Sequence, residues 1–189
     1  MIKESLDADF IFVIRDFLTP QECDSYIARS EQLGYTAAPI NTADGPTLDK
    51  DVRDNTRVLM EDTALAAEFW QRAQPFLPSR IKNWEAGGFN EHFRFYRYDP
   101  GQTFAPHFDG SFRRSSREES LLTFMVYLNE GFVGGATKFY LRNGWPRLTV
   151  QPERGMALVF VHEQLHEGAA VESGRKYVLR TDVMYVRSV

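Results

Sequence analysis

The second half of the chain is a series of short segments rich in aromatic and β-branched residues, and this pattern limits the fold more than any other feature. The segments read HFRFYRY, LLTFMVYLN, ATKFYL, RLTVQP, MALVFV and KYVLRTDVMYV, and glycine, proline and asparagine separate them. Short strands with such breaks are typical of an antiparallel β-sandwich or barrel. The sequence therefore predicts a β-rich unit that begins after Gly87–Gly88.

The first half has a different character, with one apolar segment over residues 9–18 that favours an opening strand, followed by two helical patterns. The helices are predicted over residues 19–34 and 62–77. For the first helix, Thr19 is the expected N-cap, Pro20 occupies the first helical position, and Glu22 can close a capping box. Gly34 is expected to end this helix, and Asp62 is the candidate N-cap of the second. Helices followed by strands indicate one α+β domain over residues 1–189, with helical support over about 1–85 and the β core over about 86–189.

Length and charge exclude several classes of protein. The chain has 189 residues, a net charge of −4 and scattered basic residues, so we expect one domain that does not bind nucleic acid. Cys23 is the one cysteine, which rules out an intrachain disulfide. No apolar run approaches the roughly 18 residues of a membrane span, and the N-terminus lacks the apolar core of a signal peptide. We therefore expect a cytoplasmic protein that does not enter a membrane.

The sequence His162-Glu163-Gln164-Leu165-His166 has the H-E-x-x-H pattern of zinc metallopeptidases. In those enzymes both histidines lie one turn apart on a helix, with the glutamate as base. Here the apolar segment MALVFV leads directly into His162, and Gly168 follows closely, so a helix would be barely two turns long. We therefore keep a zinc peptidase only as an alternative, and we expect His162 to lie at the rim or in a loop.

A different pair of residues offers a better partner for His166. His107 and Asp109 are separated by one residue, and on an extended chain such residues project from the same face. With a distant histidine they make a set of two imidazoles and one carboxylate. That set leaves open positions on the metal and suits non-haem Fe(II) oxygenases. The sequence predicts that His107, Asp109 and His166 meet at one metal ion.

Three segments, in this order, resemble the 2-oxoglutarate- and Fe(II)-dependent dioxygenases, and among them the prolyl 4-hydroxylase branch. RYDPGQTFAPHFDG is similar to that branch's Tyr-x-x-Gly-Gln and His-x-Asp segment. LLTFMVYLNEGFVGGATKFY resembles its central strand, Gly-Gly turn and following strand. VQPERGMALVFVHEQLHEGAAVESGRKYVLRTDVMY resembles its closing segment, with a Pro-x-x-Gly turn, the distal histidine and Gly-x-Lys-aromatic. The resemblance implies a double-stranded β-helix, a jelly-roll of the cupin kind, with supporting N-terminal helices.

The resemblance also implies roles for individual residues. His107, Asp109 and His166 match the iron ligands and so the catalytic centre, and Lys176 matches the residue that binds the C5 carboxylate of 2-oxoglutarate. Arg175 and Arg180 compete with Lys176 for that role, and Arg180 is the stronger alternative because it shares a strand face with Lys176. Tyr98 and Tyr127 match tyrosines of the cosubstrate site, with a weaker case for Thr123.

The implied reaction couples hydroxylation of a substrate C–H bond to decarboxylation of 2-oxoglutarate to succinate. It requires Fe(II), 2-oxoglutarate and O2, with ascorbate as a candidate reductant. The substrate class stays open between prolyl residues of a protein or peptide and a free amino acid or other small molecule. A catalytically inactive barrel that only binds a ligand is a further alternative. We expect substrate contacts from residues 48–59 and 112–120, since loops on a rigid scaffold commonly carry specificity.

Overall fold

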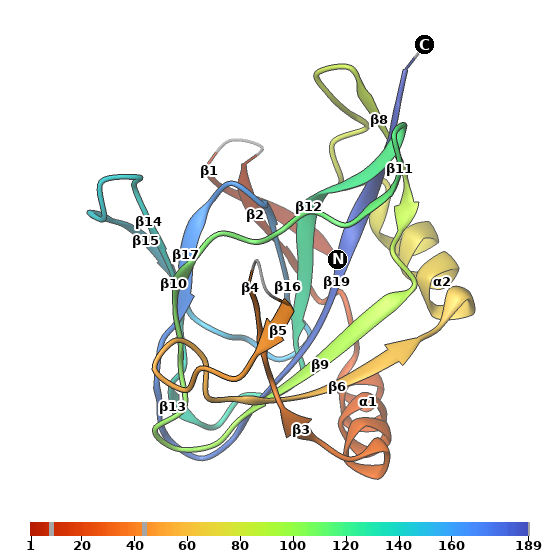
Figure 1. Ribbon diagram of the computed structural model, residues 1–189. Coiled ribbons are helices and arrows are strands. Elements are labelled where there is room, and N and C mark those ends of the chain that lie inside the picture. Colours follow the sequence, from red (N-terminus) through yellow and green to blue (C-terminus); the bar gives the residue numbers. More distant parts are fainter. Residues whose placement is uncertain (8–9, 43–44, 189) are drawn as a thin grey trace.

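Two antiparallel sheets face each other at the centre of the fold, as the computed structural model shows (Figure 1). The structure describes residues 1–7, 10–42 and 45–188. An 11-stranded sheet forms one wall and a 4-stranded sheet the other. Asp9, at which the predicted opening segment begins, lies outside the described residues. Among those residues, neither helix is long and apolar enough to cross a membrane.

The main path of the large sheet is, in order, β1 (Ile2–Asp7), β2 (Ile11–Arg15), β16 (Ala157–Val161), β12 (Glu118–Tyr127), β19 (Lys176–Arg187), β9 (His92–Tyr98), β6 (Thr56–Glu61) and β3 (Thr36–Ala37). Its side branches are β7 (Arg80–Ile81), β8 (Trp84–Phe89) and β11 (Arg113–Ser115). The small sheet has the order β10 (Phe104–His107), β17 (Leu165–Gly168), β14 (Thr137–Tyr140) and β15 (Pro146–Val150). Two separate strand pairs are β4 (Ile40–Thr42) with β5 (Gly45–Thr47), and β13 (Val133–Gly134) with β18 (Val171–Ser173).

The chain moves back and forth between the two sheets from β9 onward. Strands β9, β12, β16 and β19 lie side by side in the large sheet, while β10, β14, β15 and β17 form the small one. This is the arrangement of a jelly-roll, so the predicted fold is confirmed. Gly134 and Gly135 have positive φ angles of 77° and 66°, as the expected glycine turn requires, but Gly134 ends strand β13 and no tight turn is formed there.

The two predicted helices are present with the predicted starts, and α1 also stops at Gly34 as predicted, whereas α2 ends at Ala73, four residues before the predicted end. Helix α1 (Pro20–Leu33) begins after Thr19, whose side chain forms a complete capping box with Glu22. Helix α2 (Thr63–Ala73) begins after Asp62, whose carboxylate accepts a hydrogen bond from the backbone N–H of Leu65. These caps satisfy backbone donors that a helix leaves unpaired in its first turn. Both boundaries were therefore readable from local sequence.

The large sheet has a core on each of its faces because side chains alternate along every strand. Its outer face packs against the helices through a cluster that includes Cys23, Phe69, Phe95 and Phe124. Its inner face packs against the small sheet through a second cluster that includes Tyr127 and residues of β14 and β16. Figure 1 shows both helices beside the large sheet, on the side away from β10 and β17. The helices thus support the sheet without facing the space between the two sheets.

The division of the domain at about residue 85 needs one refinement. Residues 1–85 contribute strands as well as helices, because β1, β2, β3 and β6 all join the large sheet. The β2 segment IFVIR is almost fully buried and pairs with β16, which closes one side of the sandwich. A short strand of this kind, apolar except for Arg15 at its end, is what a segment buried on both faces requires.

Phe69 holds the outer core together and provides a test of it. Its ring makes edge-to-face contacts with Phe17 and Phe93, at centroid distances of 5.1 and 5.6 Å, and the residue has no exposed surface. We expect Phe69→Ala to lower the free energy of unfolding by roughly 3–5 kcal/mol, measured by urea denaturation, because it leaves a cavity. The matched control is Phe10→Ala, which removes a ring that is 52% exposed and should change stability by less than about 0.5 kcal/mol. Equal effects of the two changes would contradict this account.

Candidate metal centre

The three residues predicted to bind metal lie together between the sheets, although they come from two separate parts of the chain. His107 ends β10, Asp109 follows two residues later, and His166 lies on β17. Strands β10 and β17 pair in a register that sets His107 directly opposite His166. One potential ligand atom from each of the three residues lies within 4.8 Å of the others. Of the described residues, this is the one group of three or more such side chains that could hold a metal ion.

Hydrogen bonds orient both imidazole rings toward the carboxylate. The Nδ1 atoms of His107 and His166 lie 2.8 and 2.9 Å from the backbone carbonyl oxygens of Ala105 and Gln164. The Nε2 atoms face Asp109 at 3.6 and 3.8 Å, too far for good hydrogen bonds. The Nε2 atom of His107 is buried and has no hydrogen-bond partner among the described residues. A metal ion would satisfy it, and the Nδ1 contacts are the kind that fix the tautomer of a ligating histidine.

Asp109 is buried but charged. Its Oδ1 atom pairs with Arg180 at 2.9 Å, and its Oδ2 atom accepts a hydrogen bond of 2.5 Å from the hydroxyl of Thr123. Burial acts to raise the pKa of this carboxyl, but Arg180 and then His166 outweigh it and hold the pKa well below its usual range. Burial also lowers the pKa of His166 to about 4. At neutral pH the site thus presents an ionised carboxylate and a neutral imidazole, the forms that bind metal.

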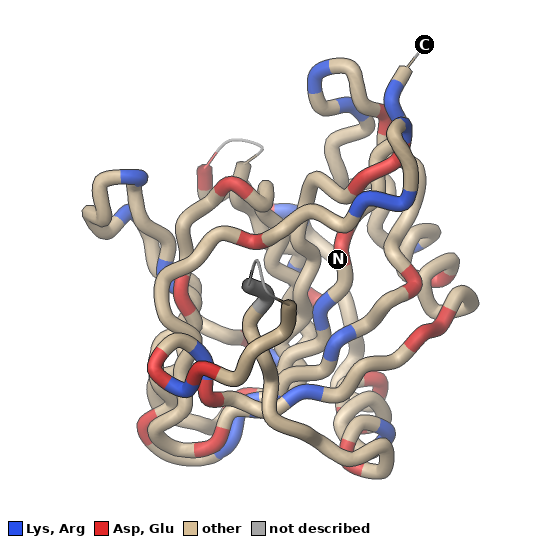
Figure 2. Tube along the Cα trace, in the orientation of Figure 1, with Lys and Arg blue, Asp and Glu red and all other residues tan. Residues whose placement is uncertain are grey.

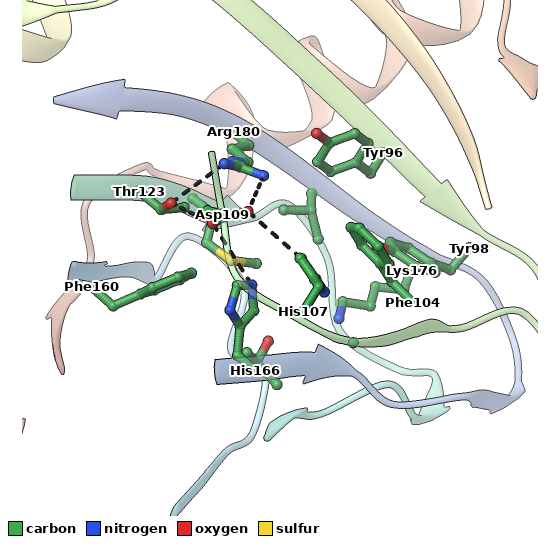
Figure 3. Close-up of a pocket in the computed structure, with 14 residues that line it drawn as sticks. Tyr96, Tyr98, Phe104, His107, Asp109, Thr123, Phe160, His166, Lys176 and Arg180 are labelled. Atoms are coloured by element: carbon green, nitrogen blue, oxygen red, sulfur yellow. Dashed lines mark hydrogen bonds and ion pairs between the residues drawn. The ribbon is translucent and has the colours of Figure 1, made fainter. Parts of the chain in front are cut away.

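Aromatic rings surround the two histidines. The ring of Phe104 stacks on His107 with the centroids 3.6 Å apart, and the ring of Phe160 lies edge-on to His166 at 4.6 Å. Phe139 lies on the neighbouring strand directly opposite His166. These rings limit the movement of the imidazoles and keep water from their faces. Figure 3 shows how the three candidate ligands converge below Arg180.

A buried lysine occupies the other end of the same cavity. Lys176 is 2% exposed, and its Nζ atom donates a hydrogen bond of 2.5 Å to the carbonyl oxygen of Gly135. The ammonium lies 5.2 Å from the ring centre of Tyr98 and 5.4 Å from that of Tyr127. No carboxylate of the described residues pairs with it, and burial lowers its pKa to about 7. A buried cation without a counter-ion is costly, so this end of the cavity suits an anionic group.

His162 lies in the turn after β16, which agrees with the expected loop position, but it is buried rather than at the rim. Its ring nitrogens lie 2.9 and 3.0 Å from the hydroxyls of Ser120 and Thr123. Since Thr123 in turn contacts Asp109, His162 lies one residue behind the candidate ligands rather than at the surface. The absence of a helix over the H-E-x-x-H segment is confirmed, because residues 162–164 form a turn before β17. Glu163 is exposed and pairs loosely with Arg142 at 3.7 Å, so nothing in the described chain supports a peptidase base there.

The role of Arg180 at the carboxylate could not be read from the sequence. Strand alternation correctly sets it on the same face of β19 as Lys176, but the sequence does not reveal that Asp109 is its partner. Thr123, weakly favoured for the cosubstrate, instead contacts this carboxylate. Tyr127 is fully buried and forms a hydrogen bond of 2.7 Å with Thr137, which lines the cavity. Exposed Arg175 pairs with Asp99 at 2.6 Å and does not line this cavity.

Comparison with known proteins agrees with this geometry. Residues 93–181 match the family described as the 2OG-Fe(II) oxygenase superfamily. A probable prolyl 4-hydroxylase 7 of Arabidopsis thaliana is 25% identical over 184 residues, which are 86% of this chain and 55% of that protein. Prolyl 4-hydroxylase 1 of the same plant is 25% identical over 190 residues, which are 88% of this chain and 66% of that protein. The chain therefore spans only part of these relatives.

Solved structures share the fold. A viral collagen prolyl hydroxylase from Paramecium Bursaria Chlorella virus-1, solved as a 2OG complex, has a TM-score of 0.65 at 22% identity and covers 97% of this chain and 99% of its own. A Trichoplax adhaerens prolyl hydroxylase in complex with a hypoxia inducible factor peptide fragment has a TM-score of 0.70 at 16% identity, with 94% and 84% covered. The predicted jelly-roll therefore agrees with known structures.

The two histidines of the H-E-x-x-H segment should respond differently to mutation. We expect His166→Ala to lower the affinity for Mn(II) at least about 100-fold, because one of three ligands is lost. His162→Ala should retain most of the affinity but reduce stability by roughly 1–3 kcal/mol, because buried hydroxyls lose their partner. Titration calorimetry with Mn(II), alongside thermal unfolding, measures both effects. Equal loss of metal by the two variants would show that His162 is also a ligand.

Proposed function

We propose, because residues 93–181 match the 2OG-Fe(II) oxygenase superfamily, that the protein is such an oxygenase and oxidises a substrate C–H bond with 2-oxoglutarate as cosubstrate. The observation that carries the proposal is the joint presence, in one cavity, of a site for a metal and a buried cation with no counter-ion. The first is the group of His107, Asp109 and His166. The second is Lys176. An enzyme that must hold a metal and a dicarboxylate side by side needs both.

His107, Asp109 and His166 would hold Fe(II), leaving positions open for other ligands. The bound iron supplies O2 activation, so that one oxygen atom enters succinate and the other the hydroxylated product, with release of carbon dioxide. Arg180 and Thr123 keep Asp109 ionised and in one orientation. The aromatic rings around the histidines exclude water, which strengthens electrostatic interactions in the cavity.

Lys176 would bind the C5 carboxylate of 2-oxoglutarate, and Tyr98 and Tyr127 would line that end of the cavity. Lys176 suits this role better than Arg180, because Arg180 is already paired with Asp109 and lies near Asp182 at 3.5 Å. Arg175 is exposed and already paired, so it is excluded from the role by its position.

For the substrate, the relatives suggest a prolyl residue of a peptide, since those proteins are named prolyl hydroxylases. A free amino acid or another small molecule is the second candidate, and it is favoured by Arg53, Arg57 and Arg94, which line a hollow beside the metal centre. The inactive-barrel alternative is weaker, because the three metal-binding side chains and the buried lysine are all present together.

The test is the incubation of the purified protein with Fe(II), ascorbate and 2-oxoglutarate. We expect succinate to form. We also expect one compound in a panel of peptides and amino acids to gain one oxygen atom, which mass spectrometry detects. Lys176→Ala should weaken 2-oxoglutarate binding to the Mn(II)-loaded protein by roughly 2–5 kcal/mol while Mn(II) binding persists. The matched control is Arg175→Ala, which should bind 2-oxoglutarate normally. No 2-oxoglutarate binding by the unaltered protein would refute the proposal.

The lowered pKa of Lys176 gives a further expectation. Its ammonium is half protonated near pH 7 and almost fully protonated only about one pH unit or more below that, and binding of a carboxylate stabilises the protonated form. As the pH rises above about 7, binding must therefore take up a proton, and the dissociation constant should increase by up to about tenfold per pH unit. Lys176→Arg should lose this dependence, because a guanidinium stays charged. The measurement is calorimetry with Mn(II)-loaded protein from pH 6.5 to 9, and identical profiles for the two proteins would disprove the expectation.

A further inference from the structure

A second hollow reaches the metal centre from outside, and arginines line it. Its wall includes Arg53, Arg57, Arg94 and Arg180, beside His107 and Asp109 of the centre. We call this hollow the arginine groove. Figure 2 marks basic residues in blue, and they recur along the neighbouring strands β6 and β9. Since the groove opens beside the metal centre, a molecule that enters it would lie next to the reacting position.

The strand register brings these arginines together on the inner face of the large sheet. Arg57 of β6 lies directly opposite Tyr96 of β9, and Arg94 of β9 lies directly opposite Arg180 of β19. Like charges that face each other across antiparallel strands destabilise a sheet, so these facing cations require nearby anions that offset their charge.

The carboxylates around the groove balance only part of the charge. Asp182 pairs with Arg94 at 3.0 Å and lies 3.5 Å from Arg180, and Asp109 pairs with Arg180 at 2.9 Å. Arg53 and Arg57 make no ion pair with any described residue. Four guanidinium groups thus share two carboxylates, one of which is a candidate metal ligand.

Arg53 shows the lack of a partner most directly. The residue is 6% exposed, and its Nε atom donates a hydrogen bond of 2.7 Å to the side-chain oxygen of Asn55. Its Nη2 atom is buried and has no hydrogen-bond partner among the described residues. The guanidinium lies 4.5 Å from the ring centre of Tyr96 and 4.3 Å from that of Phe104, so packing holds it in place. A buried donor that is fixed but unpaired suits an external acceptor.

The pKa of Tyr96 is a second sign of the surplus of positive charge in the groove. Its hydroxyl is buried, and burial acts to raise its pKa. The charges of Arg53, Arg180 and Arg94 outweigh that effect and lower the pKa below its ordinary value. Burial and the neighbouring cations Arg53 and Arg94 also lower the pKa of Arg57. An anion bound in the groove would interact favourably with each of these groups.

Resting on the proposed oxygenase function, we propose that the arginine groove binds a carboxylate group of the substrate, and so holds an acidic substrate against the metal centre. The planar fork of a guanidinium matches a carboxylate with two parallel hydrogen bonds. The chain as a whole has a net charge of −4, which disfavours a polyanion and favours a single anionic group. The cosubstrate is held separately, at Lys176 in the neighbouring cavity.

The first experiment compares acids with their neutral amides. Calorimetry on Mn(II)-loaded protein, saturated with 2-oxoglutarate, tests each common L-amino acid against its amide, N-acetyl-L-proline against N-acetyl-L-prolinamide, and a proline-containing peptide with a free or an amidated C-terminus. We expect at least one acid to bind about tenfold or more tightly than its amide. The free acids and the peptide acid distinguish a small-molecule source of the carboxylate from a peptide source.

The second experiment changes Arg57, which is half-buried in the groove and outside the proposed metal and cosubstrate sites. Arg57→Gln should weaken binding of the preferred acid about tenfold, the effect of losing one charge-assisted hydrogen bond, and should leave its amide unaffected. Arg57→Lys should restore part of the affinity. The matched control is Arg187→Gln, at an exposed arginine near the end of β19, which should have no effect. Thermal unfolding confirms that each variant is folded.

Several outcomes would overturn the carboxylate assignment. These are the absence of any acid that binds more tightly than its amide, an equal loss of acid and amide in Arg57→Gln, and binding of inorganic phosphate alone. Failure of the oxygenase function itself would appear separately, as a lack of 2-oxoglutarate binding in the unaltered protein. The comparison of acids and amides would then be repeated without 2-oxoglutarate, so the groove is tested in either case.

Discussion

The ion pair between Asp109 and Arg180 connects the metal centre to the scaffold. A carboxylate that is buried to this degree stays ionised only next to a fixed cation, and removal of one partner from such a pair typically costs about 3–5 kcal/mol. Arg180 lies on β19, at the centre of the large sheet, whereas Asp109 follows β10 of the small sheet. The pair therefore joins the two walls of the sandwich at the candidate metal centre. His107 and His166, paired across β10 and β17, complete the group from the other wall.

The outer face of the large sheet packs against the helices, and its inner face lines the cavity. Side chains on the outer face, such as Phe95 and Phe124, pack against the helices, while their neighbours Tyr96 and Thr123 face the cavity. Because adjacent residues of a strand point to opposite faces, the cavity-facing residues of the large sheet alternate with residues that anchor it. The site thus rests on packed strands rather than on loops, which favours the fixed geometry that metal binding requires.

Local patterns in the sequence were sufficient for the elements and for the main members of the site. The cap of α1 depends on four consecutive residues, and the spacing of His107 and Asp109 depends on three, so each could be recognised without knowledge of the fold. The partners of these residues could not, because they come from distant strands. Arg180 meets Asp109, and His162 meets Thr123, only through the register of β12, β16 and β19. One sequence does not specify that register, and His162 was therefore expected at the rim.

Strand β19 fixes the distance between the two ends of the cavity. Lys176 and Arg180 lie four residues apart on one face, which at about 3.3 Å per residue separates their backbones by roughly 13 Å. Substitutions can change the identity of the residues between Lys176 and Arg180, but they leave the number of these residues unchanged. A single inserted or deleted residue would turn one of the two cations toward the helices and leave the other in the cavity. The length of this segment is thus under a stricter structural constraint than its composition, because it sets the separation between the buried lysine and the arginine that pairs with Asp109.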